Sequence, residues 1–252
     1  MRIESEGEGW AICSTPRWQA LIHSRASMRI YLVRHGESQG NEDASLYGEM
    51  ADHAIPLSDA GHEQARGAGA ALRDYLDERK KWPASDAKAL GYHLRLWNSP
   101  YIRARQTADE LAAVLGPRVT SRRENVLLSE QQFGLFDGVP DDEIPKRYPD
   151  QWKHYDLLSR FHGRFWAKMP MGESRFDVAR RVHQMFFTLH RDLDLHRIED
   201  LVVVSHGVTI RAFIMMWCHE PPEWFEEEPN PKNCAIRLID DDGDQGYVFD
   251  GF

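Results

Sequence analysis

The stretch "LVRHGESQGN", residues 32–41, joins an apolar run to a dense group of polar side chains. Leu32 and Val33 are typical of a buried strand, and Gly36 marks its end. Arg34 and His35 therefore lie at the carboxyl end of that strand, which holds them rigidly. In open parallel α/β sheets, ligands bind outside the carboxyl ends of the strands. This stretch thus predicts both a fold class and the position of a site.

Two further strands are predicted to end in polar residues. They are "LRLWNS" at 94–99, which precedes an arginine, and "LVVVSHG" at 201–207. Because the carboxyl ends of parallel strands meet at one edge of a sheet, we expect the following side chains to converge: Arg34, His35, Arg103 and His206. A cationic cluster near helix N-termini is suited to hold a phosphoryl group.

Helical patterns alternate with these strands. Residues 58–82 begin at Ser58, a helix-start residue, and carry apolar residues at helical spacing. Residues 100–116 begin with Pro100, which suits a first helical turn, and end at a glycine. Residues 235–252 predict a hairpin with its turn at 241–246. This order predicts an α/β fold with three layers: a mostly parallel central sheet with helices on both faces.

The composition allows one sizeable domain, which we assign to residues 28–252. The chain has 252 residues and is 42% hydrophobic, so it can fill a real core. Residues 1–27 lack the pattern of a secretory signal, and we expect an N-terminal extension there that need not be ordered. The alternative is that this segment docks onto the domain through Trp10, Trp18 and Leu21.

Charge and apolar pattern restrict the partners. A formal net charge of −9 argues against a general nucleic-acid or anionic membrane surface, which usually needs a basic face. The longest apolar runs are far shorter than the ~20 residues of a membrane span. We therefore expect no nucleic acid and no membrane as partner, and a small molecule as substrate.

Cysteine and histidine spacing argues against a metal site. The three cysteines, Cys13, Cys218 and Cys234, are odd in number and lack CxxC spacing. This favours a reducing, cytoplasmic location over a disulfide framework or a zinc knuckle. Three histidines lie in a helical stretch without ligand-like spacing, so we expect surface or packing roles for His183, His190 and His196.

Four ordered motifs resemble those of the histidine phosphatase superfamily, in the branch that includes cofactor-dependent phosphoglycerate mutases. They are "LVRHGES" (32–38), "SPYIRARQTA" (99–108), "LLSEQQFGLFDG" (127–138) and "VVVSHGVTIRAF" (202–213). Two stretches also resemble a phosphoglycerate mutase-like phosphatase subgroup of plants, fungi and bacteria: "EQQFG" (130–134) and "RFHGRFWAKMPMGESRFDV" (160–178). The resemblance implies a phosphoglycerate mutase-like fold.

The resemblance also implies an activity: hydrolysis of phosphomonoesters through a phosphohistidine on His35, with no metal and no cofactor. Arg34, Arg103 and His206 would bind the phosphoryl oxygens, and Glu130 would be the proton donor. In-line attack needs a neutral imidazole, and nearby guanidinium groups disfavour its protonation. Phosphoryl transfer mainly requires positioning and stabilisation of charge on the equatorial oxygens, which arginine supplies better than lysine.

Several of these residues have a second interpretation. Ser38 and Asn41 match substrate-side positions of the first motif, and Gly207 follows His206 in the last motif, so all three are candidates for substrate binding. Ser38 and Asn41 are equally ordinary loop residues. Glu130 could simply cap a turn together with its neighbour, in which case Asp137 is the next candidate for the acid.

Hydrolysis is favoured over two alternatives, a phosphoglycerate mutase-type phosphotransferase and a non-catalytic phosphate-binding or scaffold protein. The mutase resemblance predicts an arginine just after the acid and a segment with paired arginines that retains a bisphosphate. Here Gln131 follows Glu130, and Lys153 and His154 stand where the paired arginines are expected. A non-catalytic site usually lacks its nucleophile or its proton donor, and this sequence has both.

An aromatic segment should lie over the site, and it contains Trp152, Tyr155, Phe161, Phe165 and Trp166. An aromatic stripe of this kind is more often core than binding surface, so packing is favoured over a lid. Arg160 and Arg164 are four residues apart, which predicts one helical face. They would be either solvated charges or groups that hold a second anion of the substrate.

Overall fold

The computed structural model describes residues 28–80 and 94–252, so the predicted N-terminal extension lies outside the described residues. Its strands are β1 (Arg29–Arg34), β2 (Leu94–Asn98), β3 (Val119–Glu124), β4 (Asp200–Ser205), β5 (Ile236–Asp240) and β6 (Gly243–Phe249). They form one sheet in the order β3-β2-β4-β1-β5-β6. The first four strands pair in parallel, and β5 and β6 are antiparallel. The predicted mostly parallel sheet is confirmed.

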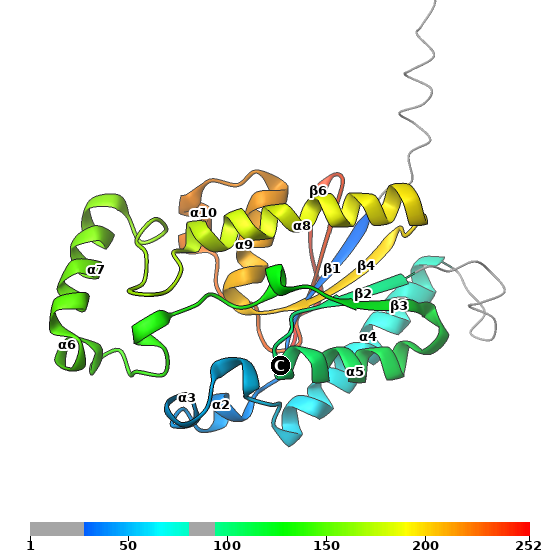
Figure 1. Ribbon diagram of the computed structural model, residues 1–252. Coiled ribbons are helices and arrows are strands. Elements are labelled where there is room, and N and C mark those ends of the chain that lie inside the picture. Colours follow the sequence, from blue (N-terminus) through cyan, green and yellow to red (C-terminus); the bar gives the residue numbers. More distant parts are fainter. Residues whose placement is uncertain (1–27, 81–93) are drawn as a thin grey trace, which may run out of the picture.

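The helices form the outer layers (Figure 1). The long ones are α4 (Asp59–Lys80), α5 (Ile102–Leu115), α7 (Pro149–His162), α8 (Arg175–His196) and α9 (Gly207–Cys218). The short ones are α2 (Gln39–Glu42), α3 (Leu46–Glu49), α6 (Ile144–Arg147) and α10 (Pro222–Glu227), with 3-10 turns at Asp52–Ala54, Gly116–Arg118, Val126–Leu128 and Gly134–Phe136. Figure 1 shows α4 and α5 on one side of the sheet and α8 and α9 on the other, while α6 and α7 lie beyond its end.

Side-chain alternation along the central strands divides the core into two layers. On β1, Ile30 and Leu32 belong to the apolar cluster with α8 and α9, whereas Tyr31 and Val33 belong to the cluster with α4 and α5. Every residue of β4 is buried, as expected for a parallel strand covered on both faces. The sheet is therefore covered by apolar layers on both faces, and its strands support the side chains at their ends.

The predicted helix boundaries are confirmed in part. The Ser58 hydroxyl accepts the N–H of Gly61 at 3.0 Å, so Ser58 starts α4 as predicted. The second helix begins at Ile102 rather than in a turn started by Pro100, because Tyr101 keeps an extended backbone with ψ 139°. It ends at Leu115, followed by Gly116 with φ 58°, as predicted.

The C-terminal hairpin is confirmed, but its predicted turn at 241–246 is wrong. Only Asp241 and Asp242 connect β5 to β6, and residues 243–246 belong to β6. The reason is a cross-strand ion pair that sequence spacing did not reveal. Arg237 on β5 donates from Nε to the Asp244 carboxylate at 3.0 Å, which keeps Asp244 in the strand.

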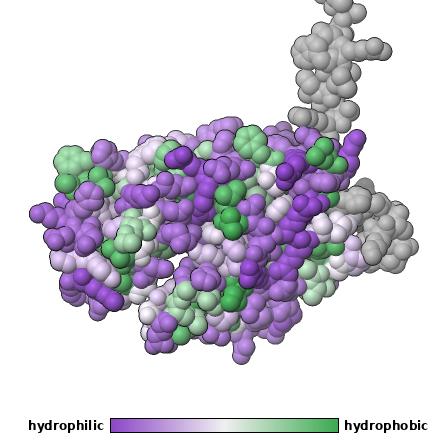
Figure 2. Space-filling view, in the orientation of Figure 1, coloured by the Kyte–Doolittle hydropathy of each residue, from purple (hydrophilic) through white to green (hydrophobic). Residues whose placement is uncertain are grey.

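The surface agrees with the charged composition. Figure 2 shows hydrophilic side chains over most of the visible face, with apolar side chains scattered between them. Across residues 28–80 and 94–252, none of the helices combines the length and the apolar character that a bilayer crossing requires.

A buried polar cluster ties the sheet to α8. Asp192 on α8 is fully buried and accepts a hydrogen bond from Trp97 Nε1 on β2 at 2.9 Å. It also forms an ion pair with Arg95 on β2, whose Nε donates to Ser121 on β3 at 2.8 Å. Arg95 is 5% exposed, so water would not solvate its guanidinium group if the Asp192 carboxylate were removed. Removing one member of such a pair leaves an uncompensated buried charge.

We therefore expect Asp192→Ala to lower the free energy of unfolding by about 3 to 5 kcal/mol, because Arg95 stays buried without its carboxylate. Urea denaturation followed by circular dichroism measures this loss. The matched control is Arg191→Ala on the exposed face of the same helix, which should change stability by less than about 0.5 kcal/mol. Equal stability of the two variants would show that the ion pair is not important for folding.

Candidate active site

The register of the sheet places the carboxyl ends of β1, β2 and β4 side by side, as predicted. Arg34 pairs with Ser205 across β1 and β4, and Asn98 pairs with Val204 across β2 and β4. The residues that follow these ends therefore face one another. The rings of His35 and His206 lie 5.0 Å apart, and Arg103 Nε lies 3.3 Å from His35 Nε2. The predicted convergence of the strand ends is thus present in the structure.

His35 is held in one tautomer. Its Nδ1 lies 2.7 Å from the carbonyl oxygen of Gly36, and since a carbonyl only accepts, the proton of the neutral ring is on Nδ1. The lone pair is then on Nε2. The side chain is 5% exposed. Burial, together with the positive charges of Arg103 and Arg34, holds the pKa of His35 well below its ordinary value.

The two arginines contribute in different ways. Arg34 donates from Nη1 to the carbonyl of Pro231 at 2.7 Å, and its buried Nε has no partner among the described residues. Arg103 is buried, and its Nη1 and Nη2 donate to the Asp52 carboxylate at 2.8 and 3.3 Å. Arg103 is thus fixed from behind by Asp52, while its Nε faces His35. The ion pair with Asp52 was not predicted, because nothing in the polar stretch around Asp52 marks it.

The ring of His206 packs beside the ring of His35. It is fully buried, its Nε2 is 2.8 Å from the hydroxyl of Ser99, and its Nδ1 has no partner among the described residues. The ring of Tyr101 packs against it at 4.8 Å in an edge-on arrangement. Burial, with the charge of Arg103 and the neighbouring His35, holds the pKa of His206 well below its ordinary value.

Glu130 caps a helix and also lines the cavity, while its role as proton donor stays a prediction. Its carboxylate accepts the backbone N–H groups of Val208 and Thr209 at 3.3 Å each, so it caps the start of α9. It also lines the same cavity as His35. A negative side chain at a helix N-terminus is favoured by the helix dipole, which fixes the position of this carboxylate.

The three further candidates occupy different places. Asn41 lines the cavity. Ser38 is fully buried and donates from its hydroxyl to Asn41 Oδ1 at 3.0 Å, so it contacts the cavity only through Asn41. Gly207 is the first residue of α9, and a Cβ at this position would lie 2.9 Å from Oδ1 of Asn230. Gly207 thus permits close packing rather than lining the cavity.

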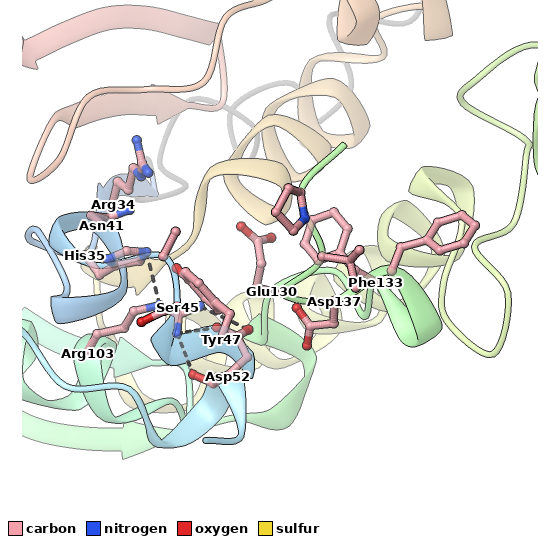
Figure 3. A pocket seen from close by; sticks show the side chains of 15 residues that line it. Arg34, His35, Asn41, Ser45, Tyr47, Asp52, Arg103, Glu130, Phe133 and Asp137 are labelled. Carbon is pink, nitrogen blue, oxygen red and sulfur yellow. Dashed lines mark hydrogen bonds and ion pairs between the residues drawn. The ribbon is translucent and has the colours of Figure 1, made fainter. Parts of the chain in front are cut away.

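The cavity has a volume of about 650 Å³. In Figure 3, Arg34 and His35 lie on one side of it and Glu130, Phe133 and Asp137 on the other. The wall residues that sequence reasoning did not assign to the site include Tyr47, Asp52, Phe133 and Phe136. They lie in or beside short helical turns that show no periodicity, so the sequence pattern did not indicate that they meet.

The aromatic segment supports this cavity from outside. Trp152 and Tyr155 on α7 pack against Phe136, with ring centroids 6.2 and 5.8 Å apart. Phe165 is buried in the core with α8, whereas Phe161 is 78% exposed. The packing interpretation therefore holds for Tyr155 and Phe165.

The prediction that Arg160 and Arg164 share a helical face is wrong. α7 ends at His162, and Gly163 follows with φ 87°, so Arg164 lies outside the helix. Arg160 forms an exposed ion pair with Asp156 at 2.7 Å. Arg164 lines a separate cavity of about 470 Å³ beside the first one.

Metal-ligating side chains do not gather in the part of the chain that the structure describes: it holds no group of three or more His, Cys, Asp or Glu residues able to bind a metal ion. The histidines of α8 are exposed, which fits the surface alternative of the predicted surface or packing roles: His183, His190 and His196. Cys218 and Cys234 are free thiols.

Known structures share this fold. The chain superposes on a structure described as a putative alpha-ribazole-5'-P phosphatase from Escherichia coli with a TM-score of 0.65, at 22% identity over 89% of this chain and 96% of that one. It also superposes on a mycobacterial glucosyl-3-phosphoglycerate phosphatase with a TM-score of 0.59, at 23% identity over 84% and 92% of the two chains. Similarity at this identity establishes the fold alone.

Curated relatives share more of the sequence. Phosphoglycerate mutase-like protein AT74 of Arabidopsis thaliana is 36% identical over 220 residues, which cover 84% of this chain and 64% of the relative. The chain thus spans slightly less than two thirds of that relative's length. Broad-range acid phosphatase DET1 of Saccharomyces cerevisiae is 25% identical over 87% of both chains. The family model of the histidine phosphatase superfamily, branch 1, matches residues 30–249. The chain therefore belongs to the histidine phosphatase superfamily.

Proposed function

We propose that the protein hydrolyses small phosphomonoesters through a phosphohistidine on His35. One observation carries this proposal: a buried imidazole, with its proton fixed on Nδ1 by Gly36, presents the Nε2 lone pair beside two guanidinium groups. This is the arrangement that a nucleophile for phosphorus requires.

In the first step, His35 Nε2 attacks phosphorus while the bond to the ester oxygen breaks. Arg103 Nε, which faces the His35 lone pair in the free protein, transfers its hydrogen bond to an equatorial oxygen of the phosphate. Arg34 has an unpartnered Nε for another oxygen. Glu130 gives its proton to the leaving oxygen, so the alcohol leaves neutral.

In the second step, water attacks phosphorus, the N–P bond breaks and inorganic phosphate is released. The Glu130 carboxylate takes the proton from the water, which returns it to its starting form. The two arginines supply the positive charge that a metal ion supplies in other phosphoryl-transfer sites, so the proposed reaction needs no metal.

The cavity wall supports hydrolysis rather than mutase-type transfer. Gln131 is 3% exposed and donates from Nε2 to the carbonyl of Glu173 at 2.9 Å, so it points away from the substrate. Lys153 and His154 are exposed and are not among the residues that line the cavity. A bisphosphate released by the phosphorylated enzyme would thus find no extra cations in this wall. The free thiols Cys218 and Cys234 support the cytoplasmic location that forms part of this proposal.

His35→Ala should abolish turnover of p-nitrophenyl phosphate, a loss of at least ~10³-fold, because no other group replaces the nucleophile. Rapid quench with ³²P-labelled substrate should trap an acid-labile, base-stable phosphoenzyme in the wild type and none in the variant. His162→Ala, exposed at the end of α7, is the control and should be unaffected. Acid-stable label on the wild type would exclude a phosphohistidine, and loss of activity with excess chelator would exclude metal independence.

Glu130→Gln tests the proton donor. An alkyl phosphate leaves as a basic alkoxide, whereas an aryl phosphate with an electron-withdrawing ring leaves as a stable anion. In single-turnover phosphorylation, the variant should therefore lose roughly 10² to 10⁴-fold with the alkyl substrate and little with the aryl one. The single-turnover condition separates this step from water attack. An equal loss with both substrates would show that Glu130 is not the donor to the leaving group, and Asp137 would be tested next.

The low pKa of His35 and His206 predicts that both rings stay neutral in mildly acidic solution, whereas an ordinary imidazole is half protonated near pH ~6.5. Their ring ¹⁵N signals should be unchanged from pH 8 to about 5.5. Because the unfolded chain binds these protons and the folded one does not, stability should fall as the pH decreases below ~6.5. A ring titration of His35 near pH 6.5 in the folded protein would contradict the prediction.

A further inference from the structure

The proposed active-site cavity has two ends of opposite charge. His35, Arg34 and Arg103 form the end that would take the phosphate. Asp52 pairs with Arg103 at this same end, whereas Asp137 lies in the wall across the cavity (Figure 3), and the proposed chemistry uses neither carboxylate. This inference rests on the proposed function and concerns the alcohol part of the substrate.

Asp52 is fixed in its place. Its side chain is 13% exposed, and both carboxylate oxygens accept hydrogen bonds from Arg103. Its backbone carbonyl also accepts from Arg103 Nη1, at 2.7 Å. The charge of Asp52 therefore stays at the cavity wall, and much of it is balanced by Arg103.

Asp137 lies in the wall across the cavity from His35 (Figure 3). It is only partly covered by its neighbours, so its carboxylate is available to a substrate. The next residue, Gly138, has φ 68°, and a Cβ there would lie 2.5 Å from the backbone oxygen of Tyr47. This close approach of the loop to α3 holds Asp137 at the cavity, and a glycine is needed for it.

The two carboxylates influence each other. Partial burial and then the negative charge of Asp52 raise the pKa of Asp137, while the positive charge of Arg103 lowers it. Counting Glu130, three carboxyl groups share this cavity with two guanidinium groups. Within this cavity, Asp52 and the scissile phosphate engage the two guanidinium groups, and further arginines line only the adjoining cavity.

We infer that Asp137 is a specificity-determining residue that selects phosphomonoesters whose alcohol carries hydroxyl or amine groups. A carboxylate only accepts hydrogen bonds, so hydroxyl and ammonium donors satisfy it. A carboxylate or second phosphate on the alcohol would be repelled at the same position. Phe133 and Phe136, which line the same wall, leave room for a carbon skeleton but supply no positive charge.

Two substrates with the same three-carbon skeleton test this inference. Glycerol 3-phosphate carries a hydroxymethyl group where 3-phosphoglycerate carries a carboxylate. We expect the wild type to prefer glycerol 3-phosphate by about tenfold or more in kcat/KM, because the carboxylate approaches Asp137. Asp137→Asn keeps the shape and removes the charge, so it should reduce this preference by roughly threefold to tenfold, mainly by faster turnover of 3-phosphoglycerate.

The control is Asp142→Asn, an exposed carboxylate near the same loop that pairs with Lys146 and does not line the cavity. It should leave the preference unchanged. A wild-type preference for 3-phosphoglycerate, an unchanged ratio in Asp137→Asn or an equal loss on both substrates would overturn the inference while leaving the proposed hydrolysis intact. Absence of any phosphoenzyme or phosphomonoester turnover would instead overturn the proposed function.

Discussion

The parallel register of β1 with β4 is the constraint on which the site depends. It places Arg34 opposite Ser205, so His35 and His206 emerge from adjacent strands at the same level. A shift of one residue would turn every side chain of β1 to the opposite face and bury Arg34 and His35 differently. Apolar layers on both faces oppose such a shift, since Ile30 and Tyr31 fill different cores. The packing that stabilises the sheet therefore also fixes the positions of the site residues.

The charged groups of the site contact one another in a row and do not form one concentrated cluster. Asp52 holds the terminal nitrogens of Arg103, and Arg103 turns its Nε to His35. The guanidinium group is therefore positioned before a phosphate arrives, which removes the cost of ordering a long side chain during the reaction. The same charge helps to keep the imidazole neutral. In the proposed reaction, one arginine thus prepares both the nucleophile and the binding of the phosphate.

Strand ends could be predicted from the sequence because short apolar runs that stop at polar residues are local signals. The positions of His35, Arg103 and His206 follow from them, and four ordered motifs supported the family. The partner of Arg103 could not be predicted, since Asp52 is 51 residues away in a 3-10 turn too short to show a periodicity. The helix end at His162 was missed for another reason: spacing of Arg160 and Arg164 indicates a face only if the helix continues, and Gly163 stops it. Long-range contacts and loop geometry were therefore the features that could not be predicted from the sequence.

The attachment of Glu130 has a consequence for how this fold changes in evolution. Leu128 accepts a hydrogen bond from the Ser205 hydroxyl at 2.8 Å, and Thr209 donates to Ser129 at 2.6 Å, so the segment before Glu130 is fastened to β4 and α9. The loop after it is held elsewhere, by the contact of Gly138 with Tyr47. Insertions and substitutions in that loop can therefore alter the shape and charge of the wall while the reacting groups keep their positions. Divergent substrate preference and a constant chemical step are compatible in one scaffold because these two segments have separate anchors.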